Sequence, residues 1–136
     1  MRVHGDYHLG QLLAAEGGGY RVIDFEGEPA RPLGERRAPQ PPERDVAGML
    51  RSLDYAARTA QRGRHAPAFD AERWLSDARR AFLASYVDSA PLALNRSLLA
   101  GLEIEKACYE VRYEAANRPD WVWLPLEALA RLAPTR

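Results

Sequence analysis

The sequence predicts a mainly helical α+β fold in which a short β-hairpin comes before a helical region. Two apolar runs, at residues 11–13 and 20–25, flank the glycine-rich segment 16–19, which is the pattern of a hairpin with a tight turn. After residue 44, apolar side chains recur every three or four positions, as they do on the buried side of a helix. The segment between these two parts contains too much proline to continue either pattern.

The hairpin carries an ordered set of reactive side chains. His4 and Asp6 come just before it, Gln11 begins its first strand, and Asp24 lies in its second. This order and spacing are typical of the catalytic loop and metal-binding segment of a phosphotransferase. Asp6 would accept the proton of a substrate hydroxyl, and His4 would brace the loop. Gln11 and Asp24 offer the oxygen ligands that Mg²⁺ prefers, and the hairpin should bring them to the same end.

Two other interpretations of these first residues stay open. His4, Asp6 and His8 could surround zinc or iron in a hydrolase, although the next histidine is His65, so further ligands would have to come from elsewhere. The segment could also be a polar loop with a structural role only. The complete ordered set favours the phosphotransferase.

Four stretches of the chain resemble the aminoglycoside and choline kinase-like phosphotransferases, and the particular residues in these stretches narrow the resemblance to the maltokinases. In order, they are residues 4–11 (HGDYHLGQ), 23–29 (IDFEGEP), 45–52 (DVAGMLRS) and 109–121 (YEVRYEAANRPDW). The resemblance implies the C-terminal lobe of a protein-kinase-like fold, with Asp6 as catalytic base. It also implies that Gln11 and Asp24 hold Mg²⁺. Gln11, where most relatives carry Asn, fits the maltokinase branch.

The implied reaction is transfer of the ATP γ-phosphate to maltose, giving maltose 1-phosphate in glycogen and α-glucan metabolism. The sequence shows no Gly-rich loop and no strand lysine paired with a helix glutamate, so nothing visible in it would grip ATP. We therefore expect a C-terminal part that is inactive alone, with an N-terminal lobe or a fused or associated trehalose synthase as partner. The alternatives are another aminoglycoside- or choline-type phosphotransferase and a non-catalytic, pseudokinase-like interaction module.

The composition limits the kinds of partner and the cellular location that we expect. Nineteen Lys and Arg balance nineteen Asp and Glu, so charge gives no argument for nucleic acid. Neither a membrane-spanning run nor a signal peptide is visible, and the single cysteine, Cys108, excludes an internal disulfide. These observations predict a cytoplasmic protein that binds neither nucleic acid nor membranes. Lys106 is the only lysine, which we attribute to codon bias.

The chain divides into three predicted ranges. Residues 1–28 hold the catalytic loop and the metal-binding hairpin, and residues 45–136 form the helical region. Residues 29–44 contain five prolines among charged side chains, which forbids a continuing helix or strand. This middle range corresponds to an activation segment whose arginines could face phosphate or substrate, and a solvated linker is an equally open interpretation.

Four helices are expected in the helical region. The first begins near residues 43–45 and buries a stripe made of Val46, Met49, Leu50, Leu53 and Ala57. Asp70 is predicted to cap the second, whose inner face is Trp74, Leu75, Ala78, Phe82 and Tyr86. The third spans about 94–117, softened at Gly101 and stopped before Pro119. Pro125 opens the last, which runs through Leu132.

Glu105, Tyr109 and Tyr113 are the predicted sugar-binding residues. They fall four apart in the third helix and therefore share one face. Aromatic rings pack against sugar C–H surfaces, and a carboxylate accepts hydrogen bonds from sugar hydroxyls. Aromatic side chains at helical spacing are more typical of a core, but this segment contributes to the sugar pocket in the maltokinases that the chain resembles.

Overall fold

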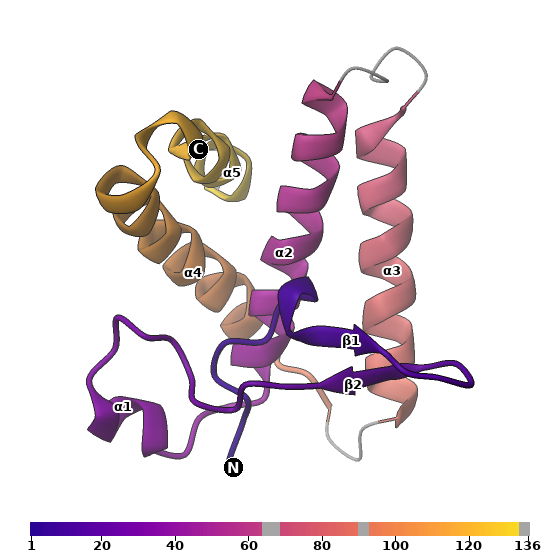
Figure 1. Cartoon of the computed structure of the whole chain (residues 1–136), viewed down its shortest axis with the longest axis vertical. Coiled ribbons are helices and arrows are strands. Elements are labelled where there is room, and N and C mark those ends of the chain that lie inside the picture. The colour runs from indigo at the N-terminus through magenta and orange to yellow at the C-terminus, as the bar shows by residue number, and fades with distance from the viewer. Residues whose placement is uncertain (64–68, 90–92, 134–136) are drawn as a thin grey trace.

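The computed structural model describes residues 1–63, 69–89 and 93–133, in which a small hairpin lies across the helical part of the molecule (Figure 1). The strands and α-helices are β1 (Leu12–Ala14), β2 (Tyr20–Val22), α1 (Leu33–Arg37), α2 (Glu43–Arg62), α3 (Ala71–Ser89), α4 (Arg96–Asn117) and α5 (Trp123–Leu132). A 3₁₀ turn over Leu9–Gln11 precedes β1, and a second over Pro119–Trp121 joins α4 to α5. The predicted mainly helical α+β fold is confirmed.

The hairpin forms where the glycines predicted it. β1 and β2 pair antiparallel, with Leu12 opposite Val22. Gly17, Gly18 and Gly19 all have positive φ angles, between 82° and 99°, which only glycine adopts without strain. The backbone N–H of Ile23 also donates to the Gln11 carbonyl, so the pairing continues one residue beyond the strands. This contact places the residue after Ile23 beside the start of β1.

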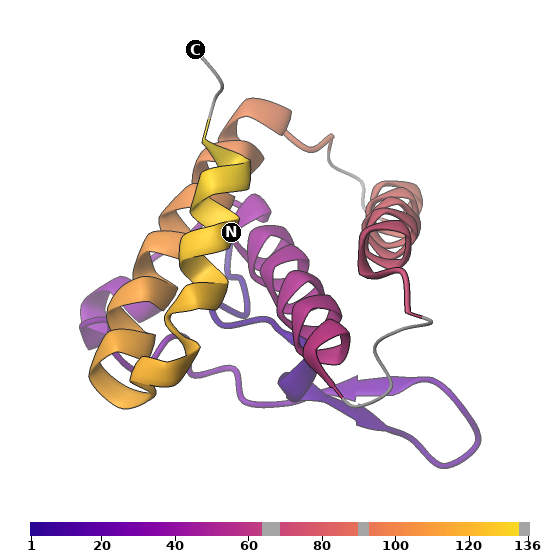
Figure 2. The ribbon, with the colours of Figure 1, turned by 90° about the horizontal axis from the view of Figure 1, so that it is seen from above.

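Helix α2 lies at the centre of the helical part. Figure 2 shows α4 and α5 on one side of α2 and α3 on the other. All five residues of the predicted α2 stripe are buried, and all but Met49 belong to one hydrophobic cluster with Ala47, Ala71, Leu75, Leu99 and Leu102. The spacing of the apolar residues therefore identified the buried face of α2 correctly. A helix that packs against neighbours on two sides buries an apolar face along its length.

The helix ends follow local signals. Asp70 precedes α3 and accepts a hydrogen bond from the backbone N–H of Arg73, which confirms the predicted cap. Asn95 caps α4 in the same way through Leu98. Helix α4 ends at Asn117, just before Pro119, and Pro125 lies in the first turn of α5, both as predicted. None of the described helices combines the length and the apolar character that crossing a membrane requires.

Three details differ from the sequence-based prediction. The proline-rich range contains the five-residue helix α1, which fits because Pro32 precedes its first turn and the next proline is Pro39. Helix α4 passes through Gly101 without interruption, since a single glycine costs only about 1 kcal/mol in a long helix. Trp74 is 39% exposed, so the inner face of α3 is narrower than expected, although Ala78, Phe82 and Tyr86 do pack against the core.

Candidate active site

The loop that carries His4 and Asp6 is tied to the first turn of α2. The Asp45 carboxylate accepts hydrogen bonds from the backbone N–H groups of His4, at 2.7 Å, and Gly5, at 2.8 Å. At Gly48, one turn further along α2, an added Cβ would lie 2.6 Å from the carbonyl oxygen of Tyr7. Glycine at this position therefore allows the helix backbone to approach the loop.

His4 links this loop to the hairpin. It is buried, and its Nε2 lies 2.7 Å from the carbonyl oxygen of Ile23, so Nε2 carries the proton and donates it. Its Nδ1 accepts the backbone N–H of Asp6 at 3.3 Å. Both ring nitrogens are thus used within the protein. Across residues 1–63, 69–89 and 93–133, no three His, Cys, Asp or Glu side chains gather as a metal-binding group. The zinc or iron interpretation consequently finds no support in the described geometry.

Gln11 and Asp24 lie side by side at the base of the hairpin. The Gln11 Nε2 donates to Asp24 Oδ2 at 3.1 Å, and Gln11 is buried. Asp24 has a φ of 61°, a left-handed conformation that few residues other than glycine adopt. The hairpin therefore brings together an amide and a carboxylate, which are the oxygen donors that Mg²⁺ prefers. These two residues fit the predicted metal site in type and proximity.

Lys106, on α4, contacts Asp6 and was not predicted from the sequence. Its Nζ lies 3.2 Å from Asp6 Oδ1 and also donates to the buried carboxylate of Glu28. Burial would lower the pKa of Lys106, but the charges of Glu28 and Asp6 outweigh burial and raise it. Lys106 is therefore a fixed cation next to the predicted base. Its uniqueness among nineteen Lys and Arg residues was one signal in the sequence.

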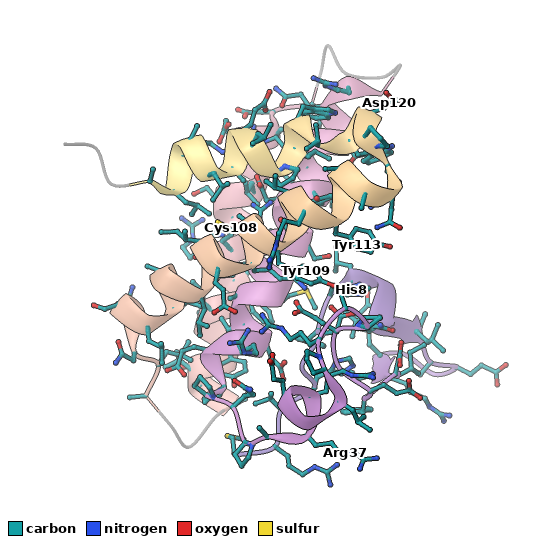
Figure 3. The ribbon with its side chains drawn as sticks, turned by 90° about the vertical axis from the view of Figure 1, so that its left-hand side faces the viewer. His8, Arg37, Cys108, Tyr109, Tyr113 and Asp120 are labelled. Carbon is teal, nitrogen blue, oxygen red and sulfur yellow. The ribbon has the colours of Figure 1, made fainter. Side chains whose placement is uncertain are left out.

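A cavity of about 360 Å³ opens beside Asp6. Its lining comes from the loop before the hairpin, the segment after it, α2, and α4 with the residue that follows it: Asp6, His8, Pro29, Gly48, Ser52, Tyr55, Lys106, Tyr109, Glu110, Tyr113, Glu114 and Arg118. The rings of Tyr109 and Tyr113 are stacked, with centroids 6.4 Å apart. Figure 3 shows these two tyrosines close to His8, with Arg37 far from them. The structure thus places two of the three predicted sugar-binding residues in one cavity with the predicted base.

Glu105, the third predicted sugar-binding residue, does not line this cavity. Its carboxylate accepts hydrogen bonds from Arg31, at 2.6 Å, and from Arg44, at 3.2 Å. Arg31 lies in the segment after the hairpin and Arg44 in the first turn of α2, and both guanidinium groups occupy the carboxylate. In this structure Glu105 holds Arg31 of the proline-rich segment against α4, and its role in sugar binding stays a prediction. Two of the four arginines in residues 29–44, Arg31 and Arg44, therefore bind a carboxylate of α4, which the sequence could not show.

Glu110 lines the cavity one turn beyond Lys106. Its Oε2 accepts two hydrogen bonds from the Arg51 guanidinium, at 3.0 Å and 2.8 Å, and its Oε1 accepts none from the described residues. Burial raises the pKa of Glu110, and the charge of Arg51 only partly offsets this effect. Glu110 thus lines the cavity with one carboxylate oxygen that is not paired within the described residues.

Glu114 lies one turn further along the same face and is 2% exposed. It accepts hydrogen bonds from the Tyr55 hydroxyl, at 3.2 Å, and from the Arg118 guanidinium. Burial, together with the charges of Glu110 and Glu114, raises the pKa of Tyr55, so its hydroxyl stays a donor. Residues 106, 110 and 114 share a four-residue spacing next to the predicted tyrosine stripe, and this was the signal that could have found them.

Asp45→Asn should loosen the loop that carries His4 and Asp6, because the new amide group cannot accept both backbone N–H groups. We expect the free energy of unfolding to fall by about 1–3 kcal/mol, the usual cost of leaving a buried donor unpaired. Amide hydrogen exchange at His4 and Gly5 should accelerate. The matched control is Asp88→Asn, the same change at an exposed position of α3. Unchanged exchange at residues 4 and 5 would contradict the role of Asp45.

No family model matches the chain. Among known proteins, it is 37% identical over 141 residues to a glucosamine kinase of Streptacidiphilus jiangxiensis, covering 98% of this chain and 32% of that protein. It is 38% identical over 137 residues to a glucosamine kinase of Mycolicibacterium smegmatis, covering 95% of this chain and 33% of that protein. The chain therefore spans about a third of the length of these relatives.

The fold agrees with the sequence comparison. A solved structure of a glucosamine kinase in complex with glucosamine, ADP and inorganic phosphate matches with a TM-score of 0.83 and 36% identity, covering 98% of this chain and 33% of that one. A second crystal form of a glucosamine kinase gives the same TM-score and identity. The arrangement of the hairpin and helices described above is thus shared with part of a sugar kinase.

Proposed function

We propose that this chain is part of an ATP-dependent sugar kinase. The observation that carries the proposal is the position of Asp6, at the wall of a cavity lined by tyrosines and carboxylates of α4. His4 connects Asp6 to the segment just before Asp24, through hydrogen bonds to both. The same small region therefore offers a base for a hydroxyl and a pair of oxygen donors for a metal. The similarity to glucosamine kinases supports this combination.

The proposed acceptor is an amino sugar, glucosamine, rather than maltose. Both named relatives are glucosamine kinases, and the similar structure holds glucosamine and ADP, whereas the comparisons give maltose no specific support. The cavity also suits an ammonium group, because Glu110 offers a free carboxylate oxygen and Glu114 lies next to it. The rings of Tyr109 and Tyr113 would pack against the C–H surface of the sugar.

In the proposed step, Asp6 accepts the proton of a sugar hydroxyl while the hydroxyl oxygen forms a bond to the γ-phosphorus of ATP. The bond from that phosphorus to the bridging oxygen breaks, and ADP leaves. Gln11 and Asp24 would hold Mg²⁺, which when bound places positive charge on the phosphate oxygens. His4 keeps Asp6 oriented through its backbone hydrogen bond.

ATP would be bound largely outside the described residues, by a further part of the kinase supplied in the same or a separate chain. The 136 residues alone should then release no ADP in a coupled assay with any sugar, because positioning ATP provides most of the catalysis. With the nucleotide-binding part supplied, turnover should be highest with glucosamine in a panel that includes glucose, maltose, trehalose, choline and an aminoglycoside. Robust turnover by this chain alone would contradict the proposal that ATP is bound by a further part of the kinase. A preference for maltose would show that glucosamine is not the acceptor.

Glu110→Gln should weaken glucosamine binding about tenfold and leave glucose binding nearly unchanged, since only the ammonium group needs the carboxylate charge. In the unchanged chain, affinity for glucosamine should fall on acidification at a higher pH than an ordinary glutamate would give. The reason is that the pKa of Glu110 is raised, so this carboxylate takes up its proton earlier than usual on acidification.

Calorimetric titration of the chain with each sugar, repeated at several pH values, would measure both effects. Glu127→Gln is the matched control, because Glu127 is 52% exposed on α5 and lies outside the cavity. The Glu110→Gln variant should lose the pH dependence together with the affinity. Equal losses of affinity for glucosamine and glucose would show that the ammonium group does not bind at Glu110.

A further inference from the structure

We propose that Lys106 is a positioning residue that reserves Asp6 for the sugar hydroxyl by keeping the ammonium group of the substrate away from it. This inference rests on the proposed function, since it concerns how an amino sugar is oriented in the cavity. It deepens that function by naming the residue that decides which end of the acceptor meets the base.

Lys106 is held in place from three sides. Its Nζ contacts Asp6 Oδ1 at 3.2 Å, donates to Glu28, and lies 4.9 Å from the ring centroid of Tyr109. Glu28 is 3% exposed and is itself bound by Arg31, so it cannot move away from the ammonium without losing its partners. The Lys106 side chain is 18% exposed and faces the cavity. The positive charge next to Asp6 is therefore a built feature of the site.

An amino sugar can bind in such a cavity in more than one orientation. Its ammonium group is attracted by every carboxylate on the wall, and these are Asp6, Glu110 and Glu114. If the ammonium occupied Asp6, the base would face a nitrogen that carries no lone pair, and no hydroxyl would be in position to attack phosphorus. The acceptor would be bound, but in an orientation that cannot react.

Lys106 prevents this orientation in two ways. It occupies Asp6 Oδ1, which leaves Oδ2, 3.8 Å from His8 Nε2, as the oxygen that can take a hydroxyl proton. Its charge also repels a second cation at Asp6, since like charges in contact disfavour each other strongly where water is largely excluded. Glu110 also interacts with the charge of Lys106 from one helical turn away, and its Oε2 is paired with Arg51, but its Oε1 accepts no hydrogen bond from the described residues. The ammonium group is thus directed to Glu110 and the hydroxyl to Asp6.

The first test is calorimetric binding of glucosamine and glucose to the chain at neutral pH. Lys106→Met should bind glucosamine about tenfold more tightly than the unchanged chain, because an unpaired carboxylate becomes available to the ammonium, while glucose binding changes by less than about twofold. Lys106→Arg keeps the charge and should behave like the unchanged chain. The double change Asp6→Asn and Lys106→Met should lose the gain. Arg112→Met, the same loss of charge at an exposed position of α4, is the matched control.

The outcomes separate this inference from the proposed function. If the unchanged chain binds neither sugar, the proposed acceptor site is wrong, and the inference falls with it. If the unchanged chain binds glucosamine but Lys106→Met binds it no more tightly than Arg112→Met does, the inference alone is overturned. A gain that survives the Asp6→Asn change would also overturn it, because the gain would then come from another carboxylate.

A second measurement tests the proposal even if the Lys106→Met variant does not fold. Because Lys106 is the only lysine, a chain labelled with ¹³C-lysine gives one lysine Cε signal. Saturating glucosamine and saturating glucose should move this signal equally, since neither sugar displaces the ammonium from Asp6. A shift specific to glucosamine would overturn the proposal. In the complete kinase, Lys106→Met should lower both kcat and KM for glucosamine, the signature of unreactive binding, whereas a purely structural role would lower kcat without lowering KM.

Discussion

Asp6→Asn should lower kcat for sugar phosphorylation about 10²–10⁴-fold in the complete kinase, the usual cost of losing a positioned general base. Asparagine has the same shape, and its carbonyl oxygen can still accept the hydrogen bond from Lys106. It cannot take a proton from the sugar hydroxyl. We therefore expect the melting temperature and the affinity for the acceptor to stay close to those of the unchanged protein. An ADP-release assay and a thermal melt followed by circular dichroism would measure the two effects.

Asp120→Asn is the matched control for this change, because Asp120 is exposed in the turn between α4 and α5 and does not line the cavity. It should retain full turnover. The rival function is a non-catalytic interaction module in which the motif survives only as structure. Turnover of the Asp6→Asn variant within about twofold of the control would show that Asp6 is not the base, and would favour that rival.

Arg51→Met should destabilise the fold by about 3–5 kcal/mol, the cost typical of breaking a buried ion pair from one side. The Arg51 side chain is 3% exposed and binds Asp54 on its own helix and Glu110 on α4. Asp54 also accepts hydrogen bonds from Arg131 on α5. Arg51 therefore joins α2 to α4, and its removal takes the guanidinium away from Glu110 and leaves Asp54 with Arg58 and Arg131.

Arg80→Met gives a direct comparison for Arg51→Met. Arg80 also pairs with an aspartate three residues away, Asp77, but its side chain is 74% exposed. An exposed pair of this kind contributes no more than about 1 kcal/mol. Urea unfolding of both variants, followed by circular dichroism, would test the contrast. Equal losses of stability would mean that the network around Arg51 is no more important than a surface pair.

Arg51→Met also bears on binding. Loss of the guanidinium removes the partner that offsets burial at Glu110, so the pKa of Glu110 should rise further. The pH range in which glucosamine affinity falls should then move upward in any fraction of the variant that stays folded. The stability of the helical core and the charge state of the proposed ammonium site are therefore linked through one residue.

The sequence by itself determined the features that depend on neighbouring residues. The three glycines at positions 17–19 identified the hairpin, because its turn needs positive φ angles. The apolar period identified the buried face of α2, and Asp70 marked the start of α3. The proximity of Gln11 and Asp24 also followed, since a hairpin of known turn position returns one residue to the other. The roles of Asp6, Gln11 and Asp24 in catalysis stay predictions.

Only the tertiary structure decided which distant side chains meet. Lys106 and Asp6 are 100 residues apart in sequence, and Asp45 lies 41 residues from His4. Glu105 and Tyr109 share a helix face, yet one binds the arginines of the proline-rich segment and the other lines the cavity. Periodicity and capping report the conformation of a few adjacent residues. The angles at which helices and loops cross are set by packing of the whole chain, and these crossings determine which charges become partners.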